Sequence, residues 1–205
     1  MNYDILISFA LATSALAISP GPDNIYVLVQ SVTNGKKYGL ATVCGLITGC
    51  IIHTTLLAFG VSAIIKANEN IFLGIKILGA CYLFFLAYKV YKSSASLKLE
   101  SNPESKRSLK GLFVQGFFMN VLNPKVTIFF LAFFPGFLSS DTLSTVWQFY
   151  ILGAVFMLVS FIIFSAIALL AGQIKTYTLN HKNSGVVLKW LQIIVFVGIA
   201  VFILI

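Results

Sequence analysis

The sequence predicts an all-α membrane protein with six transmembrane helices. Of its 205 residues, 59% are hydrophobic and only 10% are charged, whereas a soluble domain has about 25% charged residues. The apolar residues form long runs instead of amphipathic stripes, and a helix of roughly 20 apolar residues crosses a bilayer. Six runs approach or exceed that length: residues 5–30, 40–65, 71–88, 112–134, 146–171 and 186–205.

These runs leave no substantial segment for a soluble domain. We therefore expect residues 1–205 to form one integral membrane domain, with a first three-helix half at 1–91 and a second at 111–205. Residues 92–110 form a polar connector of mixed charge, which we expect to be a solvated cytoplasmic linker. The chain starts MNYD, without Lys or Arg, so we do not expect the first run to be a cleaved signal peptide.

The formal net charge of +8 comes from an uneven distribution of basic residues and does not indicate nucleic-acid binding. The connectors after the first, third and fifth runs, with the adjacent helix ends, hold eleven of the fourteen basic residues: Lys36, Lys37, Lys89, Lys92, Lys98, Lys106, Arg107, Lys110, Lys175, Lys182 and Lys189. Short cytoplasmic loops retain Lys and Arg. We therefore predict that these connectors face the cytoplasm and that both termini are extracytoplasmic.

The first run is interrupted by the sequence ISPGPDN at residues 18–24. Pro20 and Pro22 have no amide proton for the helix, and the carboxylate of Asp23 is costly in hydrocarbon. Irregular backbone at membrane depth is tolerated where it is buried in protein or lines water. The break therefore predicts a cavity, and Asp23 is a functional candidate.

The second run contains Gly45, Gly49 and His53 at four-residue spacing, so all three lie on one helical stripe. Small residues at this spacing let another helix approach closely. We expect His53 to point into the bundle. Its side chain either bonds to a neighbouring helix or relays protons, and the sequence leaves both roles open.

The fourth run is interrupted by Asn123, Pro124 and Lys125. The first run of each half thus has a proline break followed directly by a charged residue, and three helices per half give the halves opposite orientations. Interruptions at matching positions of inverted halves are the best sequence pointer to a transporter's binding site. The third, fifth and sixth runs have no proline and are predicted from length and composition alone.

The two breaks together supply the chemistry for an amino-acid zwitterion. We predict a substrate site formed by Pro20, Gly21, Pro22, Asp23, Asn24, Asn120, Asn123, Pro124 and Lys125. Asp23 would hold the ammonium group or exchange a coupling proton, with His53 as the second proton-coupling candidate. The restarted helices, with Lys125, would hold the carboxylate.

Other roles for these polar residues remain open at this point. Lys125 can bind substrate, extend toward the interface or only neutralise Asp23. Asn120 and Asn123 share a helix face and either bind substrate or only satisfy backbone groups freed by Pro124. Cys50 and His53 share a face too, but two ligands without a third and fourth do not predict a metal site.

With these motifs in order, the chain resembles the LysE/RhtB family of bacterial amino-acid exporters. The matching segments are Ser19 to Asn24, the Gly45-Gly49-His53 stripe, Lys76 to Leu83, Gly116 to Lys125, and the phenylalanines Phe129, Phe130, Phe133 and Phe134 before Pro135. The resemblance covers the whole chain. It implies proton-driven efflux of amino acids or their derivatives across the bacterial cytoplasmic membrane. Many members have asparagine in place of Asp23, which leaves the substrate charge and the coupling chemistry open.

We therefore expect a secondary active exporter that works by alternating access and proton antiport, without a cofactor. An exporter of another small solute or a divalent cation is the alternative. A membrane enzyme is disfavoured because no catalytic cluster is evident, and a scaffold would not explain two charges in mid-span. The expected partners are an amino acid, protons and membrane lipid, and glycine-rich faces permit a homodimer.

Overall fold

The computed structural model describes residues 3–63, 69–93, 108–181 and 183–205. Within these ranges every regular element is a helix. The elements are α1 (Tyr3–Ile18), α2 (Pro22–Thr33), α3 (Lys36–Leu56), η1 (Leu57–Val61), α5 (Glu69–Lys92), α6 (Leu109–Val121), α7 (Pro124–Ile128), η2 (Phe129–Phe133), η3 (Phe134–Phe137), α8 (Thr145–Leu169), α9 (Ala171–Asn180) and α10 (Ser184–Leu204).

The helices confirm an all-α membrane protein. Four helical stretches are each long and apolar enough to cross a membrane: Lys36–Val61, Asn70–Lys92, Thr145–Leu169 and Ser184–Leu204. Two further pairs pass the same test when each is taken as one span, and they are bent by 60° (α1 with α2) and 48° (α6 with the helices from Pro124 to Phe137). The described chain thus holds up to six spans, and the bends lie at the two predicted breaks.

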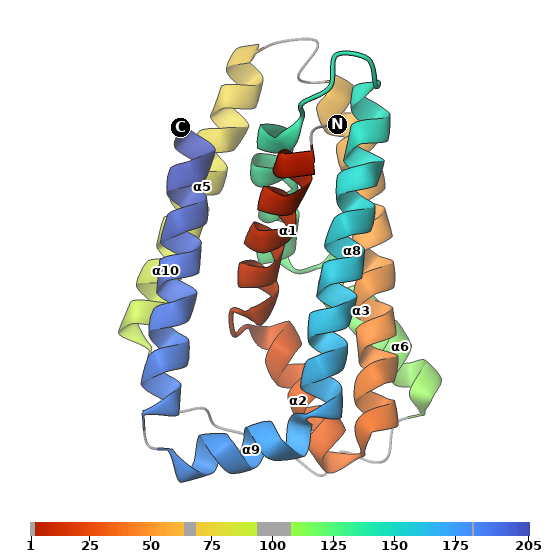
Figure 1. Ribbon diagram of the computed structural model, residues 1–205, viewed down its shortest axis with the longest axis vertical. Helices are drawn as coiled ribbons and strands as arrows, with labels where there is room; N and C mark the ends of the chain where they lie inside the picture. Colours follow the sequence, from red (N-terminus) through yellow and green to blue (C-terminus); the bar gives the residue numbers. More distant parts are fainter. Residues whose placement is uncertain (1–2, 64–68, 94–107, 182) are drawn as a thin grey trace.

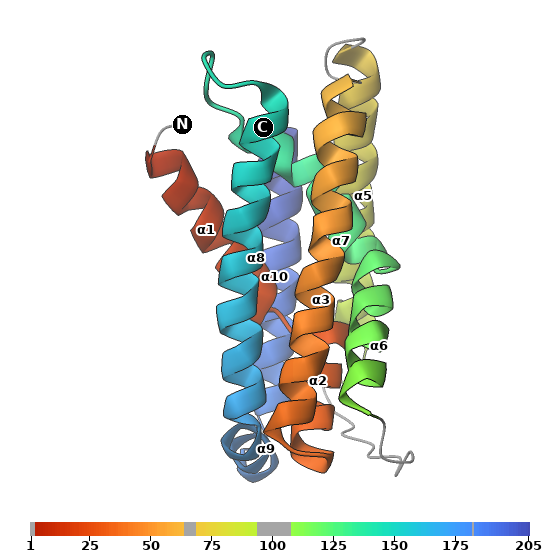
Figure 2. The same cartoon turned by 90° about the vertical axis from the view of Figure 1, so that its right-hand side faces the viewer.

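The two halves of the chain run in opposite directions through the bundle (Figures 1 and 2). The α1–α2 pair descends, α3 ascends and α5 descends, whereas the α6–α7 pair ascends, α8 descends and α10 ascends. Both ends of the chain lie at the upper end of Figure 1, and α9 lies across the lower end. This arrangement is the one that an inverted repeat of three helices requires.

The basic residues gather at the lower end of the bundle. Apart from Lys76 of α5 and Lys125 of α7, those within the described ranges lie at the start of α3, the end of α5, the start of α6, on α9 and near the start of α10: Lys36, Lys37, Lys89, Lys92, Lys110, Lys175 and Lys189. Lys66, Lys98, Lys106, Arg107, Lys182 and most of the predicted 92–110 linker lie outside the described residues. The placement of this end in the cytoplasm stays a prediction.

Aromatic rings fill part of the core between α1, α8 and the segment that follows the second break. Phe9 of α1 packs edge-on against Phe134 of η3, with ring centroids 4.9 Å apart. Phe130 stacks on Phe134 at 4.1 Å, and Phe156 of α8 lies edge-on to Phe130 at 4.9 Å. Buried aromatic rings contribute large contact areas, so this cluster fixes α1 and α8 against the segment that follows the second break.

Close packing of α3 against α6 holds the site from one side. A Cβ atom on Gly45 would meet the backbone carbonyl of Phe113, and one on Gly116 would meet that of Thr42. The two backbones approach this closely only because both positions are glycine. The small-residue stripe predicted on the second run is therefore a helix-packing surface, and His53 on it is buried as expected.

The structure adds features that the sequence pattern did not predict. Leu57–Val61 and Phe129–Phe133 form π-helical turns, a rare conformation that is frequent near functional sites. Cys50 is buried, but Cys44 and Cys81 are exposed. All three cysteines fall within the apolar runs, which predicts small buried side chains without a disulfide framework. This prediction is wrong for Cys44 and Cys81, because their helix faces point out of the bundle.

Candidate functional site

The first break separates α1 from α2 at residues 19–21. Pro20 and Pro22 cannot donate to the carbonyl groups four residues before them, so the helix ends at Ile18 and restarts at Pro22. Gly21 precedes the new helix in an extended conformation, with φ of −157° and ψ of 175°. The chain therefore changes direction inside the bundle.

The side chain of Asn24 closes part of this break. Its Nδ2 donates to the carbonyl oxygen of Ala17 at 2.6 Å, replacing a backbone donor that the interrupted helix lacks. Asp23 lies in the first turn of α2, which has no side-chain cap. The positive end of a helix dipole favours a carboxylate in this position.

The second break separates α6 from α7. Asn123 is the N-cap of α7, and its Oδ1 accepts from the backbone N–H of Lys125 at 3.0 Å. Pro124 follows as the first helical residue, a position where the missing amide proton costs little. Unlike α2, the restarted helix α7 is thus capped by its own side chain.

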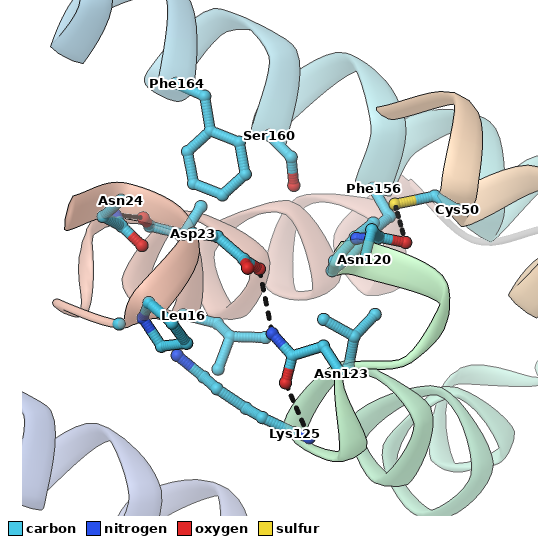
Figure 3. A pocket seen from close by; sticks show the side chains of 14 residues that line it. Leu16, Asp23, Asn24, Cys50, Asn120, Asn123, Lys125, Phe156, Ser160 and Phe164 are labelled. Atoms are coloured by element: carbon cyan, nitrogen blue, oxygen red, sulfur yellow. Dashed lines mark hydrogen bonds between the residues drawn. The ribbon is translucent and has the colours of Figure 1, made fainter. Parts of the chain in front are cut away.

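Asn123 joins the two breaks (Figure 3). Its Nδ2 donates to Oδ2 of Asp23 at 3.0 Å, across 100 residues of sequence, while its Oδ1 holds the amide of Lys125. The amide nitrogen therefore links the second break to the first, while the amide oxygen caps α7. The predicted meeting of the two breaks is present in the structure.

Lys125 extends along the first break without forming a direct ion pair with Asp23 (Figure 3). Its Nζ lies 4.9 Å from the ring centroid of Phe196 on α10, a cation–π contact. A Cβ atom on Gly21 would be 3.5 Å from this Nζ. The two charges interact electrostatically.

Asn120 is held by residues of α3. The Nε2 of His53 lies 3.1 Å from the carbonyl oxygen of Asn120. Because a carbonyl only accepts, this contact places the proton on Nε2. That carbonyl is the one for which Pro124 has no N–H. The Sγ of Cys50 donates to Oδ1 of Asn120 at 3.7 Å, and Gly49 leaves space for the same side chain, since a Cβ there would be 2.7 Å from Oδ1.

A small polar cavity of about 30 Å³ lies between the breaks. A water molecule needs about 10–15 Å³ of such volume, so the cavity has room for about two waters and not for an amino acid. Its lining comes from α1, α2, α3, α6, α7 and α8, and consists of Leu16, Ala17, Gly21, Pro22, Asp23, Asn24, Cys50, Asn120, Asn123, Lys125, Val126, Phe156, Ser160 and Phe164.

Seven of the nine predicted substrate-site residues line this cavity: Gly21, Pro22, Asp23, Asn24, Asn120, Asn123 and Lys125. Pro20 lines a neighbouring cavity instead. Pro124 is exposed, and His53 contacts the site only through Asn120. The two prolines shape the backbone of the breaks, and His53 holds Asn120 in position. Substrate binding by Pro20 and Pro124 and proton coupling by His53 stay predictions.

The sequence pattern missed the contribution of α8. Phe156, Ser160 and Phe164 lie on one face of that helix and close the cavity opposite the breaks. Ser160 is 2% exposed, and its Oγ has no hydrogen-bond partner in the described part of the chain. Figure 3 shows it directed at the space between Asp23 and Asn120. A hydroxyl within a long apolar run was the only available signal.

The arrangement places one anionic and one cationic side chain, three side-chain amides and a hydroxyl around an otherwise apolar space. Such a set can bind a small molecule that has both an ammonium and a carboxylate group. Across the described ranges, no three His, Cys, Asp or Glu side chains are grouped to hold a metal ion.

Comparisons with known proteins agree with this arrangement. The family model described as LysE type translocator matches residues 14–205. The chain is 29% identical to proteins named leucine efflux protein from Salmonella choleraesuis (strain SC-B67) and Salmonella typhimurium (strain LT2), over 185 residues that are 90% of this chain and 87% of each relative. The search of solved structures found no significant match.

Proposed function

Because the chain belongs to the LysE type translocator family, we propose that it exports amino acids or their derivatives across the bacterial cytoplasmic membrane. The observation that best supports this function is the joining of two oppositely running helix breaks at Asp23 and Asn123. Relatives named leucine efflux protein support an amino acid as the substrate. Export is coupled to proton entry, by alternating access of the site to the two sides.

The charges around the cavity fit the two ends of a zwitterion. Asp23 binds the substrate ammonium group, and Lys125 binds its carboxylate, with Asn120 and Asn123 donating further hydrogen bonds. In the structure the Asp23 carboxylate is held by Asn123. A substrate that enters replaces or shares this bond, so the hold of one break on the other depends on the occupant.

Transport requires larger openings than the structure contains. The polar cavity of about 30 Å³ is too small for an amino acid, and this supports a conformation in which the site is closed to both sides. The bends of 60° and 48° are the natural hinges, because backbone without helical hydrogen bonds changes direction at low cost. Opening one end while the other stays packed produces alternating access.

Asp23 is the first candidate for proton coupling. When the Asp23 carboxyl loses its proton, it can bind the substrate ammonium group. When it is protonated again, it releases the ammonium group, so proton and substrate compete for the same carboxylate. His53 is the second candidate. It bonds to the Asn120 carbonyl outside the cavity, so it acts on the site by positioning Asn120.

The test uses Asp23→Asn in purified protein reconstituted into vesicles, with Asp141→Asn as the matched control on an exposed loop. We expect Asp23→Asn to abolish leucine movement driven by a proton gradient, while Asp141→Asn transports like the wild type. Unchanged proton-driven transport by Asp23→Asn contradicts the mechanism. A panel of divalent cations in the same vesicles tests the alternative substrate class.

Two further expectations belong to this proposal. The end of the bundle with the basic residues faces the cytoplasm, so substrate enters from the side of α9. Glycine-rich faces permit a homodimer, and the mass of the purified protein, corrected for bound detergent, tests whether one forms.

A further inference from the structure

A second cavity lies beside the polar one and is much larger. Its volume is about 450 Å³, within the range of about 300–1,000 Å³ that small-molecule sites occupy. It lies between α2, α8, α9 and α10, and Ile25, Leu28, Ile163 and Ile167 are among the residues that form its walls. We call it the apolar chamber.

The apolar chamber is next to the polar cavity. Asn24 lines both spaces, and its amide is turned toward the first break by the bond to the Ala17 carbonyl. Pro20, from the same break, also lines the chamber. The interrupted backbone of residues 18–24 is therefore the boundary between a charged space and an apolar one.

The chamber also extends toward the end of the bundle where the basic residues gather. Ile174 and Thr178 of α9 contribute to its lining, and Figure 1 shows α9 lying across that end. A solute that comes from this side passes the chamber before it reaches the break. The chamber thus occupies the entry half of the proposed export route.

The lining selects by chemistry. The residues described around the chamber include no charged side chain, and its polar side chains are Asn24 at one end and Thr178 at the other. A polar or charged substituent placed between them would lose its hydration without gaining partners. An aliphatic substituent has no hydrogen bonds to water to lose, and it gains contact with isoleucine and leucine side chains.

We propose that the apolar chamber binds the side chain of the substrate while the ammonium and carboxylate groups lie in the polar cavity. This inference rests on the proposed function and makes it more specific: the substrates are amino acids with large aliphatic side chains. A membrane acyl chain is the competing occupant, and the test separates the two.

The experiment measures export of leucine and alanine by reconstituted protein and uses the ratio of the two rates. Ala166→Trp fills the chamber, Ile163→Ala enlarges it, and Ile162→Trp is the control on the exposed face of α8. We expect Ala166→Trp to lower the leucine-to-alanine ratio by about tenfold or more, the scale on which pockets discriminate methylene groups. Ile163→Ala is expected to raise export of phenylalanine relative to leucine about fivefold.

The control variant Ile162→Trp should keep both ratios within about twofold of the wild type. Ratios unchanged in both chamber variants would overturn the proposal and indicate that lipid occupies the chamber. Preference of the wild type for serine or lysine over leucine would overturn it too. If the wild-type protein exports no amino acid at all, the proposed function itself fails, which is a different result. Ile163→Ala only removes atoms, so it remains informative if Ala166→Trp does not fold.

Discussion

The Nδ2 of Asn123 donates to Oδ2 of Asp23 at 3.0 Å, and so joins helix breaks that are 100 residues apart in the chain. The same side chain caps α7 through the amide of Lys125. One residue therefore determines where the second helix restarts and where the carboxylate of the first break points. The relation makes Asn123 the residue whose loss should separate the two breaks.

Asn123→Ala removes both bonds. Hydrogen bonds to charged groups contribute about 1.5–3 kcal/mol, which corresponds to roughly ten- to hundredfold in affinity. We expect leucine transport to fall by about this factor, together with a lower thermal midpoint in detergent. Asn34→Ala, whose amide bonds only to Gln30 within the described structure, is the control. Equal transport by the two variants would contradict the bridging role.

His53→Gln separates positioning from proton relay. A glutamine amide can still donate to the Asn120 carbonyl, which His53 approaches at 3.1 Å, but it does not titrate. We expect His53→Gln to keep proton-driven export within about threefold of wild type and His53→Ala to lower it further, because the Asn120 carbonyl then keeps the N–H of Asn123 at 3.0 Å but loses its bond to His53, and one hydrogen bond contributes about 1 kcal/mol. Loss of proton coupling in His53→Gln with intact leucine exchange would instead assign a relay to His53.

Gly45→Ala should destabilise the packing of α3 on α6. The added Cβ meets the Phe113 carbonyl, a backbone group that cannot turn away. Overpacking of this kind costs about 1–3 kcal/mol, measured as a lower midpoint of thermal unfolding in detergent. Gly74→Ala adds the same atom in α5 where nothing lies within 4 Å, and it should not lower the midpoint.

Ser160→Ala tests the hydroxyl that faces the cavity. An unsatisfied buried hydroxyl does not stabilise the fold, so its removal should leave the thermal midpoint unchanged or slightly higher. We expect weaker leucine binding, by about fivefold, because one neutral hydrogen bond contributes about 1 kcal/mol. Ser165 on the same helix also has an unpaired buried Oγ in the described structure but does not line the polar cavity. Ser165→Ala should bind leucine normally, and a similar loss in both variants would remove Ser160 from the site.

The orientation of the bundle is open to a simple test. Because Lys and Arg accumulate in cytoplasmic loops, we expect Ile205 to lie outside the cytoplasm. Alkaline phosphatase becomes active only outside the cytoplasm, whereas green fluorescent protein fluoresces only inside it. We expect an alkaline phosphatase fusion at this position to be active and a green fluorescent protein fusion to be dark. The reverse result would invert the proposed direction of substrate entry.

The sequence was sufficient for the features that have strong chemical signals. Two proline breaks, each followed by a charge, predicted bends at Pro20–Pro22 and at Pro124, and the structure has both. The glycine stripe predicted a close helix contact, which the structure confirms for Gly45 and Gly49. The apolar runs alone predicted the membrane class, since roughly 20 apolar residues are enough for a helix to cross a bilayer. They also predicted helices, since backbone groups in hydrocarbon must bond internally.

The wall formed by α8 could not be predicted with the same reasoning. In a helix that is apolar all round, periodicity does not tell which face is buried, so Ser160, Phe156 and Phe164 gave no directional signal. The exposure of Cys44 and Cys81 was missed for a related reason, because lipid-facing and protein-facing sides of a span are both apolar. The contact of Lys125 with Phe196 depends on how α10 docks, which no local pattern determines.

The most direct measurement of the central claim uses the native thiol of Cys50, which lines the polar cavity. In a variant with Cys44→Ser and Cys81→Ser, a small water-soluble alkylating reagent reaches Cys50 only when the site opens. If the two breaks enclose the substrate site, saturating leucine should slow this alkylation several-fold, while alkylation of Asp141→Cys, on an exposed loop, in a variant with all three native cysteines replaced by serine stays unchanged. Alkylation of Cys50 at the same rate with and without leucine, in protein that transports leucine, would contradict the account.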